Sequence, residues 1–201
     1  MLDAWCEWLG ALATDAEAAL AAAIAYRELD APSRDRWLAA LDQDAARLAV
    51  PRIAVYAPLL AVESDPARRA RIAEAIGPDD ASATPRSEPR ALIGLDSRGA
   101  RVALLISPLY LDFVQVLACG YRTASGFEWV RHDPIVSARR APRHGDVVEG
   151  VTVERSPLKP LIDDLAHAVL AHRRGGRELP EALRVFADLF GPVAGSTPPP
   201  P

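Results

Sequence analysis

The fold of this chain is decided by the stretch ALIGLDSRGARVALLISPLYLDFVQVLACGYRTASGFEWVRHDPIV, residues Ala91–Val136. The stretch is rich in aromatic and β-branched residues, which favour strands. Alanine-rich segments with apolar residues at helical spacing lie on both sides of it. We therefore expect the α+β fold class: an N-terminal antiparallel helical bundle, then a mostly antiparallel sheet of about five strands that is packed by C-terminal helices.

Five strands are expected where runs of strand-forming residues lie between turn signals. They are Ala91–Leu95, Arg101–Ile106, Tyr110–Arg122, Phe127–His132 and Val147–Val153. Residues 108–119 also fit a helix, because Ser107 can cap it, Pro108 can be its first residue and Gly120 can end it. We favour the strand, since the residues are poor helix formers and can pair with the segment that follows.

Helical spacing of apolar residues predicts the helices of the first 76 residues. The first helical segment, residues 2–29, contains the capping-box pattern Thr14–Glu17 and can divide there into two helices. The later helices begin at Ser33, Pro51 and Asp65. Pro58 is expected to kink or split the helix that contains it, because it removes a backbone donor and its ring crowds the preceding turn.

The domain organisation is predicted from one proline-rich boundary. Residues 77–90, GPDDASATPRSEPR, contain three prolines and no large apolar residue, so we expect a linker there. It separates a helical region, residues 1–76, from an α+β region, residues 91–191. Residues 192–201 are expected to be a disordered, Pro-rich tail. Two helices are expected in the second region. The first begins at Ser156-Pro157, and the last spans Glu181–Phe190.

The composition indicates a globular, cytoplasmic protein. Half of the 201 residues are hydrophobic and a quarter are charged, which suits a folded core. No apolar run reaches the roughly 18 residues that a membrane span needs, and no basic region precedes an apolar segment at the N-terminus. Only Cys6 and Cys119 are present, too few for a disulfide framework. Lys159 is the only lysine, which together with the many alanines suggests a GC-rich bacterial coding sequence.

The charge pattern favours a protein partner over nucleic acid. The net charge of −4 argues against a general nucleic-acid binder. Residues 3–30 are mostly acidic, whereas residues 131–144 are mostly basic. We take Arg139, Arg140 and Arg143 as the partner-binding residues, which can meet phosphate, an acidic partner or the acidic N-terminal helices of the same chain. Nucleic-acid binding through this loop is the weaker alternative, because it needs more basic residues and stacking aromatics.

The sequence contains no phosphate-binding glycine loop, zinc-protease motif or nucleophile elbow. An Asp112–His132 dyad is excluded by the expected register. If Arg122 pairs with Phe127, the two side chains lie on opposite faces and about 16 Å apart. The same register places Cys119 diagonal to His132, and this pair forms the weak candidates for a catalytic nucleophile and base.

Other isolated polar residues have structural explanations. Asp112 is expected to be a solvent-facing acid at the sheet edge, where it discourages aggregation. Trp129 is expected opposite Gly120, which its ring can cover. His167 and His172 are five residues apart, whereas metal ligands on one helix face are three or four apart. We therefore expect no metal and no cofactor.

These observations predict a non-catalytic bacterial cytoplasmic protein that acts as a protein-interaction or regulatory module, without contact to a membrane. The alternative is an enzyme or small-molecule-binding domain with its pocket between the sheet and the C-terminal helix, around Leu161–His172. A deep pocket there with several converging polar groups would favour the alternative, and a filled core would not.

Overall fold

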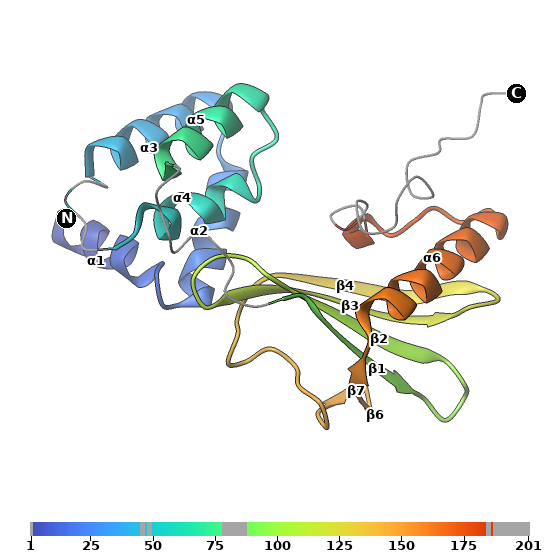
Figure 1. The fold of residues 1–201 in the computed structure, drawn as a ribbon. Coiled ribbons are helices and arrows are strands. Elements are labelled where there is room, and N and C mark those ends of the chain that lie inside the picture. Colours follow the sequence, from blue (N-terminus) through green and yellow to red (C-terminus); the bar gives the residue numbers. More distant parts are fainter. Residues whose placement is uncertain (1, 45–46, 48–49, 78–87, 184–185, 187–201) are drawn as a thin grey trace, which may run out of the picture. The chain divides into compact units, whose positions relative to one another are not determined.

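The computed structural model describes residues 2–44, 47, 50–77, 88–183 and 186. These residues form six α-helices and seven strands (Figure 1), so the expected α+β fold class is confirmed. The helices are α1 (Leu2–Ala11), α2 (Ala16–Glu28), α3 (Ala31–Asp44), α4 (Arg52–Leu60), α5 (Pro66–Ile76) and α6 (Leu158–Arg174). The strands are β1 (Arg90–Leu95), β2 (Arg101–Pro108), β3 (Phe113–Arg122), β4 (Gly126–Ser137), β5 (Val147–Val148), β6 (Val151–Thr152) and β7 (Glu154–Ser156).

The chain divides into two compact units, and β3 and β4 contribute residues to both. The first unit comprises the described residues of Met1–Ser87, Pro108–Val114 and Pro134–Arg140; the second comprises those of Glu88–Ser107, Gln115–Asp133 and Ala141–Pro201. The expected linker, residues 77–90, lies mostly outside the described residues. The expected tail, residues 192–201, and most of the expected last helix, Glu181–Phe190, also lie outside them.

Two apolar clusters hold the first unit together. The larger one draws on α1 to α5 and the turn after α1, and its buried members are Leu9, Leu12, Ala22, Tyr26, Leu38, Leu41, Val55, Tyr56, Leu59 and Ile72. Three half-buried tryptophans, Trp5, Trp8 and Trp37, pack on this cluster with ring centroids 5.4 to 6.1 Å apart. The smaller cluster joins the turn between β2 and β3 to α2 and α4, and its members include Ala19, Ile53, Tyr110, Phe113 and Ile135.

Two helices of the first unit, α2 and α3, begin at acidic residues rather than at the hydroxyl caps expected from the sequence. Asp15, not Thr14, caps α2, and its carboxylate accepts the backbone N–H groups of Glu17 and Ala18. Similarly, Asp30 accepts the backbone N–H of Ser33 at 2.9 Å. A carboxylate adds a favourable interaction with the helix dipole that a hydroxyl lacks.

The predictions that proline and glycine gave for the third and fourth expected helices are confirmed in part. Asp65 caps α5 and Gly77 ends it, as predicted. Pro51 directly precedes α4, as the sequence suggests, but α4 is not split at Pro58. The helix continues to Leu60, so Pro58 lies in its last turn and removes a single backbone donor there.

The main sheet has the strand order β4-β3-β2-β1-β7. The predicted first hairpin is confirmed: β1 pairs antiparallel with β2, from Arg90 opposite Ile106 to Leu95 opposite Arg101. The side chain of Asp96 shapes the loop between them, because it accepts the backbone N–H groups of Arg98 and Ala100 at 2.8 and 2.7 Å.

The segment for which the sequence also allowed a helix forms a turn followed by a strand. β3 begins at Phe113, and Leu111 adopts a positive φ of 50° in the turn before it. Asp112 is therefore an exposed turn residue, not a residue of an edge strand, and its carbonyl accepts the backbone N–H of Ala138 at 2.8 Å. The ring of Trp129 lies against Gly120, as predicted, since a Cβ at that glycine would overlap it.

The expected fifth strand, Val147–Val153, is not a single strand. Its residues divide into β5 and β6, which pair with each other across a tight turn, and β7 follows. Glu149 and Gly150 both have positive φ, 50° and 78°, which is the signature of a two-residue hairpin turn. Glycine accepts this conformation readily and glutamate does not, so the turn could not be read from the sequence.

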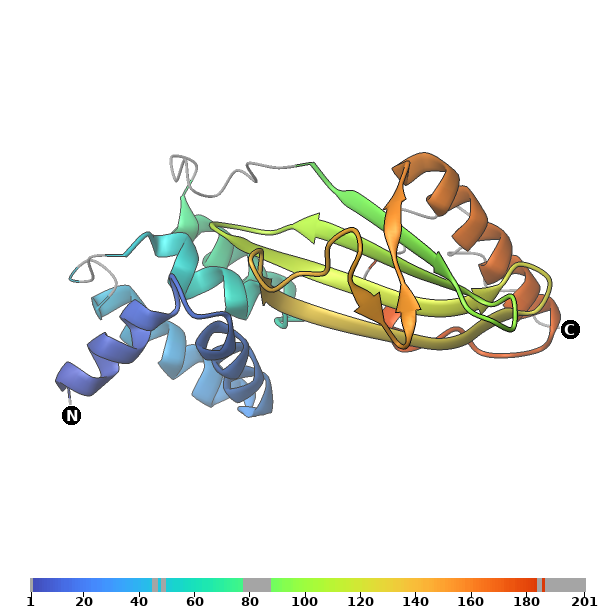
Figure 2. The ribbon, with the colours of Figure 1, turned by 90° about the horizontal axis from the view of Figure 1, so that it is seen from below.

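The second unit covers both faces of the sheet. On one face, α6 packs Leu161, Leu165, Ala168 and Val169 onto buried residues of β1 to β3 (Figure 1). On the other face lies the β5–β6 hairpin (Figure 2). A Cβ at Gly94 would come within 2.5 Å of the Val151 side chain and 2.6 Å of the Thr152 carbonyl, so only glycine lets β6 approach β1 this closely.

No single helix among the described residues is long and apolar enough to cross a membrane. Residues Ala4–Ala11 and α2 meet the requirement of length and composition only as a pair, and that pair bends by 112°. The second helix of this pair, α2, contributes to the core, since its residues Ala19, Ala22, Ala23 and Tyr26 are all buried.

Candidate functional site

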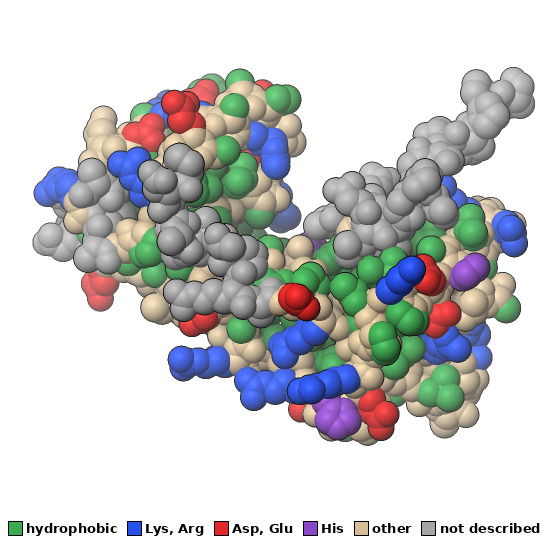
Figure 3. All heavy atoms as spheres, in the orientation of Figure 1, with side chains coloured by type: hydrophobic (Ala, Val, Ile, Leu, Met, Phe, Trp, Pro, Cys, Tyr) green, Lys and Arg blue, Asp and Glu red, His purple; other side chains and the backbone are tan. Residues whose placement is uncertain are grey.

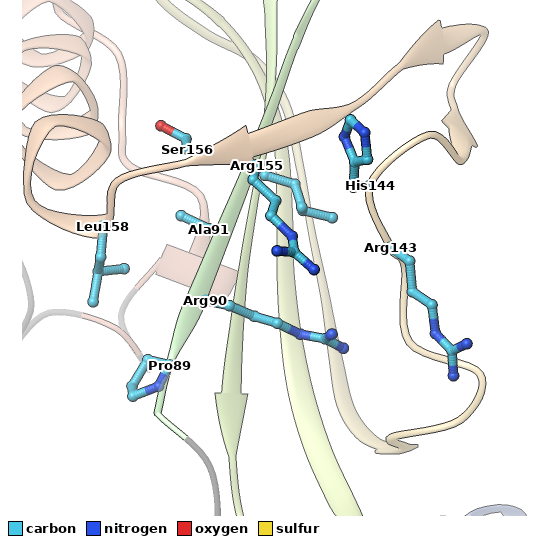
Figure 4. A pocket seen from close by; sticks show the side chains of 9 residues that line it. Pro89, Arg90, Ala91, Arg143, His144, Arg155, Ser156 and Leu158 are labelled. Carbon is cyan, nitrogen blue, oxygen red and sulfur yellow. The ribbon is translucent and has the colours of Figure 1, made fainter.

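A pocket lined by arginine lies at the edge of the sheet, in the second unit. Its volume is about 570 Å³, and it opens between β1, β7, the start of α6 and the loop that precedes β5. The lining residues are Pro89, Arg90, Ala91, Leu92, Arg143, His144, Arg155, Ser156 and Leu158. The side chains of Arg90 and Arg155 extend toward the loop that carries Arg143 and His144 (Figure 4). We name this site the arginine pocket.

The pairing of β1 with β7 brings two of these arginines together. Arg155 lies opposite Leu92 in the antiparallel register. Arg90 is two residues before Leu92, and side chains two residues apart on a strand point to the same face. Arg90 and Arg155 are therefore diagonal neighbours on one face of the sheet, where like charges repel each other.

Carboxylates do not balance this charge. Neither Asp nor Glu lines the arginine pocket in the described part of the chain. Arg90 and Arg155 are exposed, and neither forms an ion pair with another described residue. Glu154, the nearest acid in β7, points to the opposite face because it is adjacent to Arg155, and it lines a separate hollow beside Ile93. An anion from outside the described residues would remove the repulsion.

The start of α6 borders the arginine pocket on the face of the sheet opposite to Arg90 and Arg155. Pro157 precedes the helix and has no side chain that could cap it, and no acidic residue occupies the first turn. Lys159 lies in that turn instead, where its charge opposes the helix dipole. Ser156 and Leu158, on either side of the helix start, line the pocket. Uncapped N–H groups at a helix N-terminus favour anions.

Hydrogen bonds hold the loop that contributes Arg143 and His144. The Asp146 carboxylate accepts the backbone N–H of Arg143 at 2.8 Å. The backbone of the same loop is paired with Val153, which accepts from Gly145 at 2.8 Å and donates to Asp146 at 3.0 Å. Basic side chains and a histidine gather over this part of the molecule (Figure 3). The loop is thus anchored next to β7 by its backbone, and its basic side chains remain exposed.

The three arginines that the sequence singled out do not lie at one site. Arg139 and Arg140 belong to the first unit, whereas Arg143 belongs to the second. The guanidinium of Arg140 pairs with Glu17 of α2 at 2.6 Å, although both side chains are more than 70% exposed. One of the expected partners, the acidic N-terminal helices, is therefore the partner of Arg140. Arg143 lines the arginine pocket.

Arg90 and Arg155 were missed from the sequence. Arg90 was placed in the expected linker, and Arg155 lies beyond the end of the expected fifth strand. The repeated basic residues near strand ends were a usable signal, but only the observed register shows that the two are diagonal neighbours on one face of the sheet.

The weak catalytic candidates, Cys119 and His132, have separate partners. The thiol of Cys119 is 1% exposed, and it donates to the carbonyl of Ala103 at 3.8 Å. Burial raises the pKa of this thiol to about 12, so it stays protonated. The Nε2 atom of His132 lies 3.2 Å from the side-chain oxygen of Gln115, and the His132 ring packs edge-on against Phe186. Burial also lowers the pKa of His132. This geometry does not support a nucleophile–base pair.

His172 and His167 also have structural contacts. The Nδ1 atom of His172 accepts the backbone N–H of Phe127 at 3.2 Å, and its Nε2 lies 3.0 Å from the carbonyl of Glu178. Gly126 touches the backbone of His172, which leaves no room for a Cβ. His167 contacts the carbonyl of Asp163 at 2.8 Å. Within the described ranges, no three His, Cys, Asp or Glu side chains are placed to share a metal ion.

A second group of arginines surrounds a buried carboxylate in the first unit. The side chain of Glu63 is fully buried, and Arg68 donates to it at 2.9 Å and Arg34 at 3.4 Å. The hydroxyl of Tyr26 donates to it at 2.7 Å, and two backbone N–H groups at 2.8 Å. Burial alone would raise the pKa of Glu63, but the hydrogen bonds from the Asp65 backbone, Tyr26 and Arg68 outweigh it and lower the pKa to about 2. We name this group the Glu63 network.

The chain was compared with family models, with curated proteins and with solved structures, and none of them matches it. The function must therefore be inferred from the site itself. In the arginine pocket, Arg90 and Arg155 lie close together, and no carboxylate of the described residues lines the pocket.

Proposed function

We propose that the protein is a non-catalytic interaction module that binds an acidic segment of another protein in the arginine pocket. One observation carries the proposal: Arg90 and Arg155 are held as diagonal neighbours by the β1–β7 register, and no carboxylate lines their pocket in the described chain. Guanidinium groups bind carboxylates and phosphates through paired hydrogen bonds, so an acidic ligand satisfies both charge and donors.

The space between the sheet and α6 supports this proposal over the alternative of a small-molecule pocket there. Leu161 and Leu165 of α6 are at most 1% exposed, and they are packed against Leu117 and Cys119 of β3. A core filled in this way favours the interaction module over that alternative. A hollow does lie beside the β3–β4 turn and the end of α6, but it is open to solvent and lined mainly by Thr123, Ser125, His167, Arg174 and Arg177.

We also propose a bacterial, cytoplasmic location for the protein and a supporting role for its helices. The single lysine and the alanine-rich composition favour a bacterial, cytoplasmic protein. The helices of the first unit would form an antiparallel bundle, and the C-terminal helices would support the sheet that carries the arginine pocket. Nucleic-acid binding is less favoured, because Arg140 of the basic loop already pairs with Glu17.

A peptide-binding experiment tests the proposal. The ligand is a fluorescent peptide with four glutamates among glycine and serine residues, and the reference peptide has glutamines in their place. We expect binding of the acidic peptide alone, weakening as salt is added, and at least tenfold weaker binding to the variant Arg90→Ala/Arg155→Ala. The matched control is Arg27→Ala/Arg36→Ala, which removes two exposed charges from the first unit. Equal binding to both double variants would refute the proposed site.

A further inference from the structure

We infer that His172 is a proton-sensitive latch. Its neutral ring holds the turn between β3 and β4 against the end of α6, and the turn is released when the ring takes up a proton. His172 lies in the last turn of α6, at the end of the helix away from the arginine pocket, so the inference does not depend on the proposed function. It rests on the two contacts of the ring, on the burial of this contact and on the close fit of the turn.

The two ring nitrogens of His172 have opposite roles. Nδ1 accepts the backbone N–H of Phe127 at 3.2 Å, and Nε2 lies 3.0 Å from the carbonyl of Glu178. A carbonyl oxygen can only accept, so Nε2 carries the hydrogen and Nδ1 keeps its free lone pair. The neutral ring therefore joins the start of β4 to the segment that follows α6.

A proton on Nδ1 removes the acceptor that Phe127 uses. Both nitrogens of a protonated histidine are donors, so the N–H of Phe127 would then point at a second N–H group. His172 is 6% exposed and Phe127 is 2% exposed. A buried donor without an acceptor destabilises the structure that encloses it. Histidine ordinarily changes its charge between pH 5 and 8, so the contact is formed at pH 8 and lost towards pH 5.

The turn lies directly against the helix at this point. A Cβ at Gly126 would be 2.6 Å from the Cβ of His172 and 2.8 Å from its backbone nitrogen. Arg177 adds a further contact, because its guanidinium donates to the carbonyls of Ser125 and Phe127. Ser125 and Arg177 also line the open hollow at the end of α6. Release of the turn therefore changes the shape of that hollow.

The charged groups near the latch are mostly cationic. From β4, His172 meets the ring and the backbone of Phe127, and the carboxylate of the next residue, Glu128, is paired with Arg122 at 2.8 Å. Glu178 contributes its carbonyl and is itself exposed. The C-terminal end of a helix favours a positive charge, so α6 permits protonation. Cationic neighbours in α6 and the segment after it repel the protonated ring and favour its release; they are Arg173, Arg174 and Arg177.

Hydrogen exchange of the Phe127 amide tests the latch in the full chain. NMR measures the exchange rate between pH 8 and pH 5. The rate is divided by that of an unfolded peptide of the same sequence, which removes the intrinsic dependence on pH. We expect the protection of this amide to fall at least about tenfold from pH 8 to pH 5. The amide of Leu104, in the central strand β2, should keep its protection.

A pair of matched variants assigns the effect to one histidine. His172→Asn keeps an acceptor oxygen near the position of Nδ1 but takes up no proton, so the protection of Phe127 should no longer depend on pH. The control is His167→Asn, which replaces an exposed histidine of the same helix and should behave as the wild type does. Constant protection in the wild type, or a fall that persists in His172→Asn, would overturn the inference.

The ¹⁵N chemical shifts of the His172 ring give a second measurement that needs no variant. At pH 8 we expect the tautomer with the hydrogen on Nε2, and the loss of Phe127 protection should follow the titration of the ring. The opposite tautomer at pH 8 would overturn the inference. Protection that changes at a pH where the ring does not titrate would also overturn it.

Discussion

The Glu63 network and the arginine pocket both contain arginine side chains, but the arginines have different roles in the two sites. In the network, the chain itself supplies the anion, and Arg34 and Arg68 are less than a fifth exposed around a carboxylate that is fully buried. In the pocket, Arg90 and Arg155 are exposed and have no carboxylate partner among the described residues. An arginine with an internal anion stabilises the fold, whereas arginines gathered without one are available to a ligand.

The largest expected effect comes from removing the internal anion. Glu63→Gln should lower the free energy of unfolding by about 3 kcal/mol, because Arg34 and Arg68 would then be enclosed without a buried counter-charge. Urea unfolding, monitored by tryptophan fluorescence, measures this change. The ring centroid of Trp37 lies 6.2 Å from that of Tyr26, which belongs to the Glu63 network. Glu17→Gln breaks an exposed ion pair with Arg140 and serves as the control, with no measurable change expected. A Glu63→Gln effect as small as the control would contradict the comparison.

The same carboxylate should make stability depend on acid. The pKa of Glu63 falls from 4.5 to about 2 on folding, so its ionised form stabilises the protein above pH 4.5. This contribution, about 3 kcal/mol by linkage, is lost progressively as the pH falls from 4.5 to 2. The difference in unfolding free energy between the wild type and Glu63→Gln should shrink over that range. A difference that stays constant down to pH 2 would show that Glu63 does not titrate as described.

Local signals predicted much of the fold. The loop Asp96–Gly99 identified the β1–β2 hairpin, and Asp65 and Gly77 identified the ends of α5, because a turn or a cap depends on residues that are close in sequence. The strand assignment for β3 was also correct. The division of Val147–Val153 into β5 and β6 was missed, since Glu149 adopts a positive φ that its side chain does not suggest.

The candidate site could not be predicted in the same way. Arg90 is more than 50 residues before Arg155 in the sequence, so their approach depends on the pairing of β1 with β7. The basic loop was visible in the sequence and contributed Arg143. The separation of Arg139 and Arg140 from Arg143 reflects the turn of the chain from one unit into the other after residue 140. No pattern in the sequence marks that point.

An engineered carboxylate would make the arginine pocket resemble the Glu63 network. Pro89 is exposed and lines the pocket, so Pro89→Glu should place a carboxylate near Arg90. We expect the affinity for the acidic peptide to fall about fivefold, because the new carboxylate competes for the guanidinium groups and repels the ligand. Pro89→Gln is the uncharged control. Equal peptide affinity for the two variants would indicate that the pocket charge does not control binding.

The smallest effect is expected on the free energy of unfolding when one pocket arginine is removed and no ligand is present. Arg90→Ala should change the free energy of unfolding by less than about 0.5 kcal/mol, and in the stabilising direction at low salt, because it relieves repulsion from Arg155. Added salt should remove this gain by screening. Thermal unfolding at 20 and 500 mM sodium chloride measures it as a difference between wild type and variant. A clear destabilisation would mean that Arg90 supports the fold, as Arg68 does.

The central claim is that the arginine pocket takes its anion from outside, and ligand-dependent unfolding tests it most directly. The unfolding midpoint is measured in sodium phosphate and in sodium chloride of equal ionic strength, for the wild type and for Arg90→Ala/Arg155→Ala. A bound anion stabilises the folded state by mass action. We expect phosphate to raise the midpoint of the wild type and to leave that of the double variant unchanged. The same rise in both proteins, or no rise in either, would contradict the account.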